Sequence, residues 1–291
     1  MAHTVIAVVC DCDETLAPDT TEQLLSHFGI DAKQFYEMQA RKLVDAGYDP
    51  PLAYMNEMLR MAQDNGPLSQ LTQAKMIEIG RSLKFYPGVP EVFTELANEV
   101  HTKYADFGIR LEAYVITGGI ADLVKASLLG QAVRKVWGCN FAYGTDGKII
   151  GIKTVVSFTE KTRFLFNIEK GLVLPEHDNQ PYAVNAPMDQ TERRIPMKNI
   201  VYLGDGPSDV PCMSIIQKVG EGYVIGILNK RKPYQSWALG FGRRANLTIP
   251  PNFKRDTEYS GFEHIREAVI QIADRIQNEI RMRGRGHAPK Y

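Results

Sequence analysis

Two aspartates separated by a single residue follow the first apolar run of the chain. Residues 4–10 are almost continuously apolar and rich in β-branched side chains, which predicts a strand buried on both faces of a parallel sheet. Asp11 and Asp13 come directly after it, and strand alternation places both carboxylates on the same side of the chain. Such carboxylates repel each other unless a cation lies between them, and their oxygens suit a hard ion such as Mg²⁺. The pair taken alone is also compatible with a turn or a helix cap.

A candidate anion-binding segment follows the second apolar run, at residues 111–116. Thr117 ends this predicted strand and precedes Gly118-Gly119 and a predicted helix. A hydroxyl group and exposed backbone N–H groups at the start of a helix can bind an anion such as phosphate. An ordinary glycine turn has the same composition, so the segment indicates anion binding only in combination with the other features.

Lys161 and two further aspartates complete the candidate residues. Lys161 lies in the first turn of a helix predicted at 159–169, where a cation opposes the helix dipole, which hints at a functional use. Asp205 follows a third predicted strand at 199–203, and Asp209 lies one helical turn later. Ligands of open α/β sheets bind outside the carboxyl ends of the strands. The conjunction of these features is therefore more specific than any one of them.

The elements that must position these residues alternate between strands and helices. Further strands are predicted at 222–227 and 245–249, and helices at 89–104, 120–130, 159–169, 208–218 and 231–239. This alternation predicts a doubly wound parallel α/β sheet with right-handed crossovers. Residues 139–156, centred on Asp146-Gly147, are typical of a hairpin, and residues 172–198 of a long irregular insertion.

Residues 19–84 interrupt this alternation. Their helical patterns lie at 20–28, 32–45, 51–64 and 69–81. We interpret the segment as an α-helical cap inserted into a core formed by residues 1–18 and 85–291. Thr20 and Gln23 are predicted to form a capping box at the first of these helices. Hinges are expected near Ala17-Pro18 and Tyr86-Pro87-Gly88, where proline and glycine punctuate the chain.

In this order, the four chemical features resemble the motifs of the haloacid dehalogenase-like (HAD) superfamily of phosphohydrolases. The inserted helical segment is similar to the branch that includes the phosphoserine phosphatases, and Tyr86-Pro87-Gly88-Val89 resembles the return segment of that branch. Glu14 departs from the pattern, because many members carry glycine between the second aspartate and the threonine. The resemblance implies a Rossmann-like core under a helical cap.

The same resemblance implies a magnesium-dependent phosphatase that hydrolyses a small phosphorylated metabolite through an aspartyl-phosphate intermediate. It gives Asp11 the roles of nucleophile and magnesium ligand. It makes Asp13 the general acid/base, which also offers its backbone carbonyl to the metal.

For the remaining candidates, the resemblance implies binding and positioning roles. Thr117, Gly118 and Lys161 would bind the phosphoryl oxygens. Asp205 would complete the metal site, and Asp209 would orient Lys161 or serve as an alternative ligand.

Other functions stay open at this point. A phosphomutase or another phosphotransferase shares the aspartates but passes the phosphoryl group back to a substrate. A haloacid dehalogenase is less expected, because it does not need the acid that Asp13 supplies. A non-catalytic binding protein is less expected, because it does not need the complete set of candidate catalytic residues. A P-loop or Rossmann nucleotide site is disfavoured, because Gly118-Gly119 and Gly204-Asp205-Gly206 lack the required glycine pattern.

Composition gives weaker constraints on partners and location. Lys+Arg and Asp+Glu both total 34, and this balance favours neither nucleic acid nor an anionic membrane as a partner. No apolar run approaches the roughly 20 residues of a membrane span, and no signal peptide is recognisable, so we expect a cytoplasmic protein. The four cysteines form neither a zinc motif nor a disulfide framework and are expected to be buried thiols. The apolar stripe of residues 259–282 predicts a helix that docks on the core or forms a dimer interface, so the oligomeric state stays open.

Overall fold

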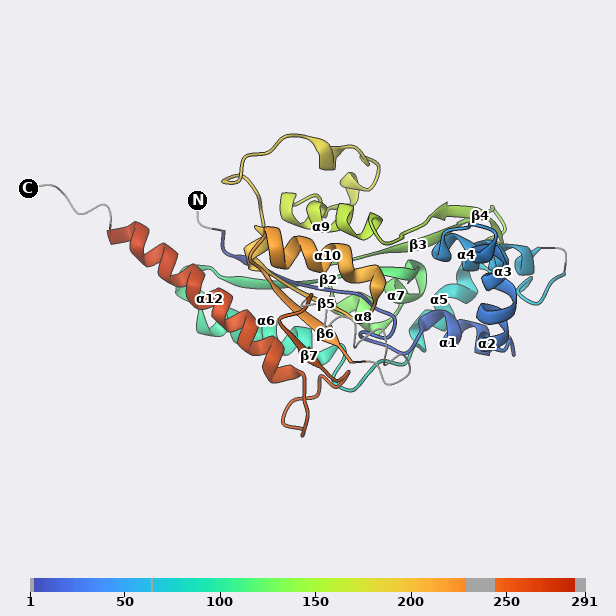
Figure 1. Cartoon of the computed structure of the whole chain (residues 1–291), viewed down its shortest axis with the longest axis horizontal. Helices are drawn as coiled ribbons and strands as arrows, with labels where there is room; N and C mark the ends of the chain where they lie inside the picture. Colours follow the sequence, from blue (N-terminus) through green and yellow to red (C-terminus); the bar gives the residue numbers. More distant parts are fainter. Residues whose placement is uncertain (1–2, 64, 229–243, 286–291) are drawn as a thin grey trace, which may run out of the picture.

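The computed structural model describes residues 3–63, 65–228 and 244–285 of the chain. Its centre is a seven-stranded sheet in the order β4-β3-β2-β1-β5-β6-β7 (Figure 1). Neighbouring strands run parallel except β3 and β4, which form the predicted hairpin. The strands are β1 (Val5–Cys10), β2 (Arg110–Ile120), β3 (Lys135–Tyr143), β4 (Ile149–Thr154), β5 (Ile200–Gly204), β6 (Tyr223–Ile227) and β7 (Leu247–Ile249). The predicted α/β class is confirmed; the helix expected at 231–239 lies outside the described residues.

Apolar side chains build one core on each face of the sheet. Alternate residues of β1 point to opposite cores, as the pleat of a strand requires. One core is covered by α9 (Glu160–Lys170) and α10 (Val210–Ser214), the other by α6 (Glu91–Lys103) and α12 (Phe262–Arg285) (Figure 1). The apolar stripe of α12 is buried in the second core, so the predicted docking of this helix is confirmed.

Several elements differ from their predicted bounds. Strand β2 continues beyond Ile116 to Ile120, and its register against β3 shifts in between. The helix predicted at 120–130 is split into α7 (Ala121–Ala126) and α8 (Leu128–Ala132). The split occurs because Ser127 has an extended backbone (ψ 174°) and its hydroxyl caps α8 at Gly130 N.

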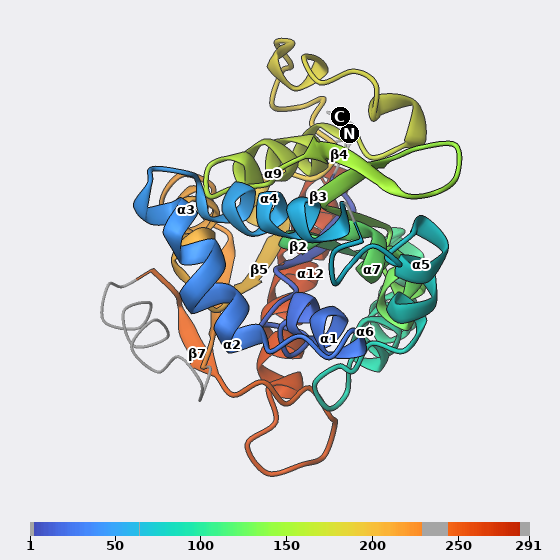
Figure 2. The same ribbon diagram turned by 90° about the vertical axis from the view of Figure 1, so that its right-hand side faces the viewer.

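The segment between β1 and α6 is helical, as predicted. Figure 1 shows these helices together beyond one end of the sheet, and Figure 2 looks at them from that end. They are α1 (Thr20–His27), α2 (Ala32–Gln34), a π-helical turn (Phe35–Ala40), α3 (Arg41–Asp45), α4 (Pro50–Ala62) and α5 (Gln73–Arg81). The predicted capping box at Thr20 is wrong. The N-cap is Asp19, whose carboxylate accepts a hydrogen bond from Glu22 N at 2.9 Å, while Gln23 Nε2 donates to the carbonyls of Pro18 and Lys84.

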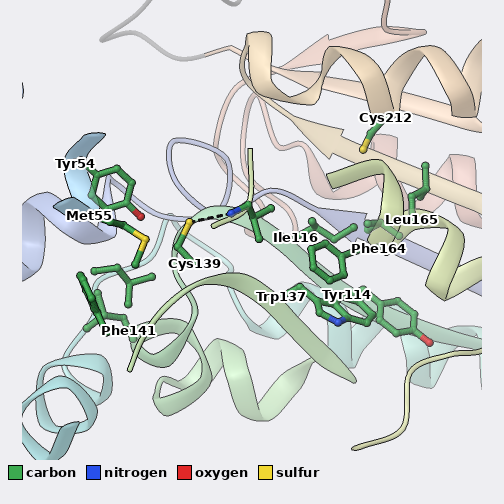
Figure 3. Packing of buried hydrophobic residues seen from close by; sticks show 14 of the residues in the cluster. Tyr54, Met55, Tyr114, Ile116, Trp137, Cys139, Phe141, Phe164, Leu165 and Cys212 are labelled. Carbon is green, nitrogen blue, oxygen red and sulfur yellow. Dashed lines mark hydrogen bonds between the residues drawn. The ribbon is translucent and has the colours of Figure 1, made fainter. Parts of the chain in front are cut away.

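Helices α4 and α5 are packed against the rest of the molecule. At Gly80 of α5, a Cβ atom would lie 2.5 Å from Leu123 O of α7, so only glycine permits this close contact. The start of α5 is held by a hydrogen bond from Gln73 N to Gly147 O in the β3–β4 hairpin, at 2.8 Å. Figure 3 shows Tyr54 and Met55 of α4 beside Cys139 and Phe141 of β3. The division into a 19–84 cap and a core stays a prediction.

The 172–198 insertion contains no strand or α-helix, as predicted. It has short 3₁₀ turns and is held to the core by ion pairs. Arg194 contacts Glu112 of β2, and Arg193 Nη1 lies 2.7 Å from Glu169 Oε1 of α9. These half-buried pairs fix an otherwise irregular segment over that face.

The burial of the cysteines agrees with the sequence. All four cysteines are buried and free. Burial raises the pKa of Cys10 and Cys12, which keeps these thiols protonated and unreactive. Among the described residues, no helix is both long and apolar enough to cross a membrane.

Candidate active site

Three adjacent parallel strands bring the predicted residues to one edge of the sheet. Strands β2, β1 and β5 are neighbours, so their carboxyl ends meet. Asp11 directly follows β1, Asp205 directly follows β5, and Thr117 lies in the irregular last part of β2. Lys161 arrives from the first turn of α9, and its Nζ lies 3.0 Å from Asp11 Oδ2. The predicted residues therefore converge, although they are far apart in sequence.

Three buried carboxylates form a candidate metal site. Oxygens of Asp11, Asp205 and Asp209 all lie within 4.8 Å of one another. Negative charges at this spacing inside a protein repel strongly, and a hard divalent cation with oxygen ligands removes the repulsion. The donor set thus fits Mg²⁺. The side chain of Asp13 is not in this group, and the expected contribution of its carbonyl stays a prediction.

The carboxylate of Asp209 is fixed by several hydrogen bonds, more than metal binding alone would require. Its Oδ1 accepts hydrogen bonds from Lys161 Nζ and Tyr202 OH, both at 2.8 Å, and its Oδ2 accepts from Gly206 N at 3.3 Å. The carboxylate is fully buried. These contacts fix Asp209 behind the cluster, where it orients the ammonium group of Lys161 toward Asp11.

The charges of the cluster determine the protonation of Lys161 and Asp11. Burial alone would lower the pKa of Lys161, but the charges of Asp11 and Asp209 outweigh it and hold that pKa above its ordinary value. Burial raises the pKa of Asp11, and the carboxylates of Asp209 and Asp205 raise it further, against the opposing effect of Lys161. Lys161 is thus held in its charged form, whereas burial and the neighbouring carboxylates disfavour the charged form of Asp11.

Asp13 is placed beside the cluster and facing the same cavity. Its Oδ1 accepts a hydrogen bond from Thr20 N at 2.7 Å, and Thr117 Oγ1 donates to its Oδ2 at 3.4 Å. Burial raises the pKa of Asp13, while the hydrogen bond from Thr20 opposes that shift. A carboxyl group with a raised pKa can carry a proton to or from a reacting group.

Gly119 matters more for this geometry than Gly118, which the sequence singled out. A Cβ atom on Gly119 would lie 2.2 Å from Asp13 Oδ2, whereas one on Gly118 would meet only Val156 O at 3.6 Å. The amide of Gly119 also donates to Thr117 Oγ1 at 2.9 Å, which orients the threonine hydroxyl. The missing side chain at 119 therefore leaves room for Asp13.

The contacts of Glu14 explain why the sequence departs from the motif at this position. It has φ +59°, a left-handed conformation that favours glycine and that a longer side chain adopts only at some cost. Its buried carboxylate accepts hydrogen bonds from Tyr86 OH at 3.0 Å and from Asp19 N at 3.4 Å. Glu14 thus ties together the two connections between the helical segment and the sheet.

A cavity of about 500 Å³ opens directly over the cluster. The sheet side supplies Asp11, Asp13 and Asp205, and the helical segment supplies the opposite wall. The residues of that wall were not predicted from the sequence; they are Asp19, Tyr36, Ala40, Arg41, Val44, Pro50, Pro51 and Tyr54. Their apolar members carry no spacing that distinguishes a cavity wall from a helix core.

Comparison with known proteins identifies the fold. No family model matches the chain. An uncharacterized protein of Borreliella burgdorferi is 25% identical over 236 residues, which cover 74% of this chain and 79% of the relative. Among solved structures, a HAD-family hydrolase from Salmonella enterica serovar Typhi matches with a TM-score of 0.54 and 12% identity, over 92% of this chain and 72% of the other.

Two phosphoserine phosphatase structures also match. A probable phosphoserine phosphatase from Vibrio cholerae has a TM-score of 0.52 at 15% identity, covering 95% of this chain and 67% of the other. A phosphoserine phosphatase in its apo form has a TM-score of 0.50 at 14% identity, covering 89% of this chain and 97% of the other. The chain therefore has the fold of these hydrolase and phosphatase structures, in agreement with the fold that its sequence motifs indicate.

Proposed function

We propose that this protein is a magnesium-dependent phosphatase that hydrolyses small phosphate monoesters through a phosphorylated Asp11. The observation that carries the proposal is the contact of Asp11 with Lys161 at 3.0 Å, at the floor of a cavity large enough for a small metabolite. Fold alone does not establish chemistry, but two structures of matching fold are named phosphoserine phosphatases, which supports the proposal.

Each residue of the site has a step in the proposed reaction. A carboxylate oxygen of Asp11 attacks phosphorus, and the bond from phosphorus to the ester oxygen breaks. Lys161, the hydroxyl of Thr117 and the amide of Gly118 bind the phosphoryl oxygens. Asp13 donates a proton to the leaving alcohol and then takes one from the water that hydrolyses the acyl phosphate, releasing inorganic phosphate and restoring Asp11.

The metal has a defined place in this scheme. Asp11 and Asp205 would hold Mg²⁺, with Asp209 behind them. When bound, the ion neutralises charge on the phosphoryl oxygens, which lets an anionic nucleophile approach. It also favours the ionised form of Asp11, whose pKa burial otherwise raises.

The direct test is release of inorganic phosphate from a panel of small monoesters by the purified protein with Mg²⁺. Release from at least one ester, with multiple turnovers, is the expected result. Transfer of the phosphoryl group between sugar or alcohol acceptors without net release would instead identify a phosphotransferase. No release and no transfer with any ester would contradict the proposal.

Substitution of the two adjacent glycines provides a sharper test of the geometry. Gly119→Ala should lower kcat/KM by about a hundredfold, because its Cβ would push Asp13 from its place, and small misplacements are costly. Gly118→Ala, the matched control, should stay within about threefold, because its Cβ meets only an ordinary contact and the amide N–H remains. Equal activity of the two variants in a steady-state phosphate-release assay would contradict the placement of Asp13.

The helical wall over the cavity predicts discrimination by substrate size. Tyr54 of α4 donates a hydrogen bond to Gly118 O at 2.9 Å, so this wall lies directly on the proposed phosphate-binding segment. Such a cover excludes bulk water and large substrates. We expect kcat/KM for small phosphate esters to exceed that for phosphopeptides by at least about a hundredfold. A preference for phosphopeptides in side-by-side assays would show that the segment is not a lid over the site.

A further inference from the structure

The helical wall of the cavity is mostly aromatic and apolar, apart from Asp19 and Arg41. Tyr36 and Tyr54 face it from the helical segment, with ring centroids 6.5 Å apart and planes at 67°. Both rings are fixed by their hydroxyls, since Tyr54 OH donates to Gly118 O at 2.9 Å and Tyr36 OH donates to Asp19 at 3.4 Å. Their polar ends are thus engaged with the protein.

Phe158 supplies a third aromatic ring from the segment that precedes α9. It lies just before α9, lines the same cavity and is 42% exposed, although it is a large apolar side chain. Pro50 and Pro51 at the start of α4 add rigid apolar surface nearby. A flat apolar group entering this space would remove apolar surface from water on both itself and the wall.

The charges of the cavity lining argue against a second anionic group on the substrate. Five carboxylates line it, and Arg41 is the basic residue that the described lining contains. The guanidinium of Arg41 pairs with Asp45 at 2.7 Å, and its side chain is 66% exposed. Lys161 lies beneath the cavity and is already held by Asp11 and Asp209. Among the described lining residues, a carboxylate or second phosphate on the substrate would therefore meet mainly like charges, with Arg41 as the basic side chain.

We propose that the preferred substrate is a phosphate monoester whose alcohol portion carries an aromatic ring and no further negative charge. The phosphoryl group lies over Asp11, and the ring packs against Phe158 and the two tyrosines of the helical wall. This inference rests on the proposed phosphatase function and adds the class of leaving group. The ring can belong to an aryl-substituted alcohol or to a nucleoside, and the experiment separates these sources.

The test compares four primary alkyl esters, so that the chemistry of the leaving oxygen is similar throughout. They are 2-phenylethyl phosphate, uridine 5′-monophosphate, n-butyl phosphate and phosphoserine. Burial of a ring should raise kcat/KM for one or both ring-bearing esters at least about tenfold above that for n-butyl phosphate. Phosphoserine should be the poorest of the four because of its carboxylate. A rate for n-butyl phosphate equal to both ring-bearing esters, or a preference for phosphoserine, would overturn the inference.

Substitution of Phe158 assigns the effect to this wall. Phe158→Ala should raise KM for the preferred ring-bearing ester about tenfold and leave kcat/KM for n-butyl phosphate within about threefold. Tyr182→Ala, at a ring that is 83% exposed and outside this cavity, should change neither value. An equal loss for both esters in Phe158→Ala would show a structural rather than a recognition role.

A binding measurement keeps this inference separate from the proposed reaction. Asp11→Asn protein with Mg²⁺ should bind the preferred ring-bearing ester at least about fivefold more tightly than n-butyl phosphate in calorimetric titrations. Ring-dependent binding without turnover by the wild-type protein would uphold recognition of the ring by this cavity and contradict the phosphatase function. Binding that does not depend on the ring would overturn the inference even if hydrolysis is observed.

Discussion

Replacement of Asp11 by asparagine is expected to lower phosphate-ester hydrolysis by at least about a thousandfold, to the background of the assay. Asparagine keeps the shape of the side chain but removes the anionic oxygen that attacks phosphorus. The fold should survive this change. Burial and the neighbouring carboxylates raise the pKa of Asp11, so its negative charge destabilises the metal-free protein. Lys161 would keep Asp209 as its partner at 2.8 Å.

The control for this substitution is a second aspartate-to-asparagine change away from the cavity. Asp106, exposed in a turn before β2, serves this purpose, and Asp106→Asn should keep wild-type kcat and KM. Thermal unfolding should give Tm values within a few degrees for all three proteins. Hydrolysis of an aryl phosphate by Asp11→Asn at a rate near that of the wild type would contradict the covalent mechanism.

Removal of divalent metal should abolish activity as completely as the Asp11→Asn substitution does. Excess chelator is expected to reduce phosphate release to background, and added Mg²⁺ to restore it. Ca²⁺ should restore it poorly, because its looser and larger coordination shell lets Asp11 bind the ion with both oxygens instead of attacking phosphorus. Full activity in excess chelator would exclude the proposed metal site.

A readout without catalysis checks the same site. Mg²⁺ that binds only the folded protein should raise its Tm in a concentration-dependent way. The shift should disappear in Asp205→Asn, which removes one of the three clustered carboxylates. Persistence of the same shift in Asp205→Asn would place the ion elsewhere.

Much of the site could be predicted because its residues follow strands and begin helices. A buried strand is visible as an apolar run, and the topology of a parallel sheet then forces the residues at the strand ends together. Asp11, Thr117 and Asp205 meet for this reason, and the contact of Lys161 with Asp11 agrees with the expected set. Their roles in catalysis stay predictions until the experiments above are done.

The features that sequence could not reveal depend on contacts between distant residues. Nothing around Tyr54 indicates that its hydroxyl reaches Gly118, 64 residues later. Local propensity favours glycine for the left-handed backbone conformation that Glu14 adopts. Its hydrogen-bond partner Tyr86 comes after the helical insertion in the sequence. The N-cap at Asp19 instead of Thr20 reflects a choice between adjacent good caps, which local propensity does not settle.

The two outer strands of the described sheet have a consequence for self-association. An open strand edge can template pairing with another chain, and both edges here are poor templates. Strand β7 has only three residues and runs into Pro250 and Pro251, which have no N–H to offer. Strand β4 is irregularly paired, with two shifts of register, and residue Thr72 bridges to Lys148 just before it. Sheet extension between copies is therefore disfavoured at both ends of the described sheet.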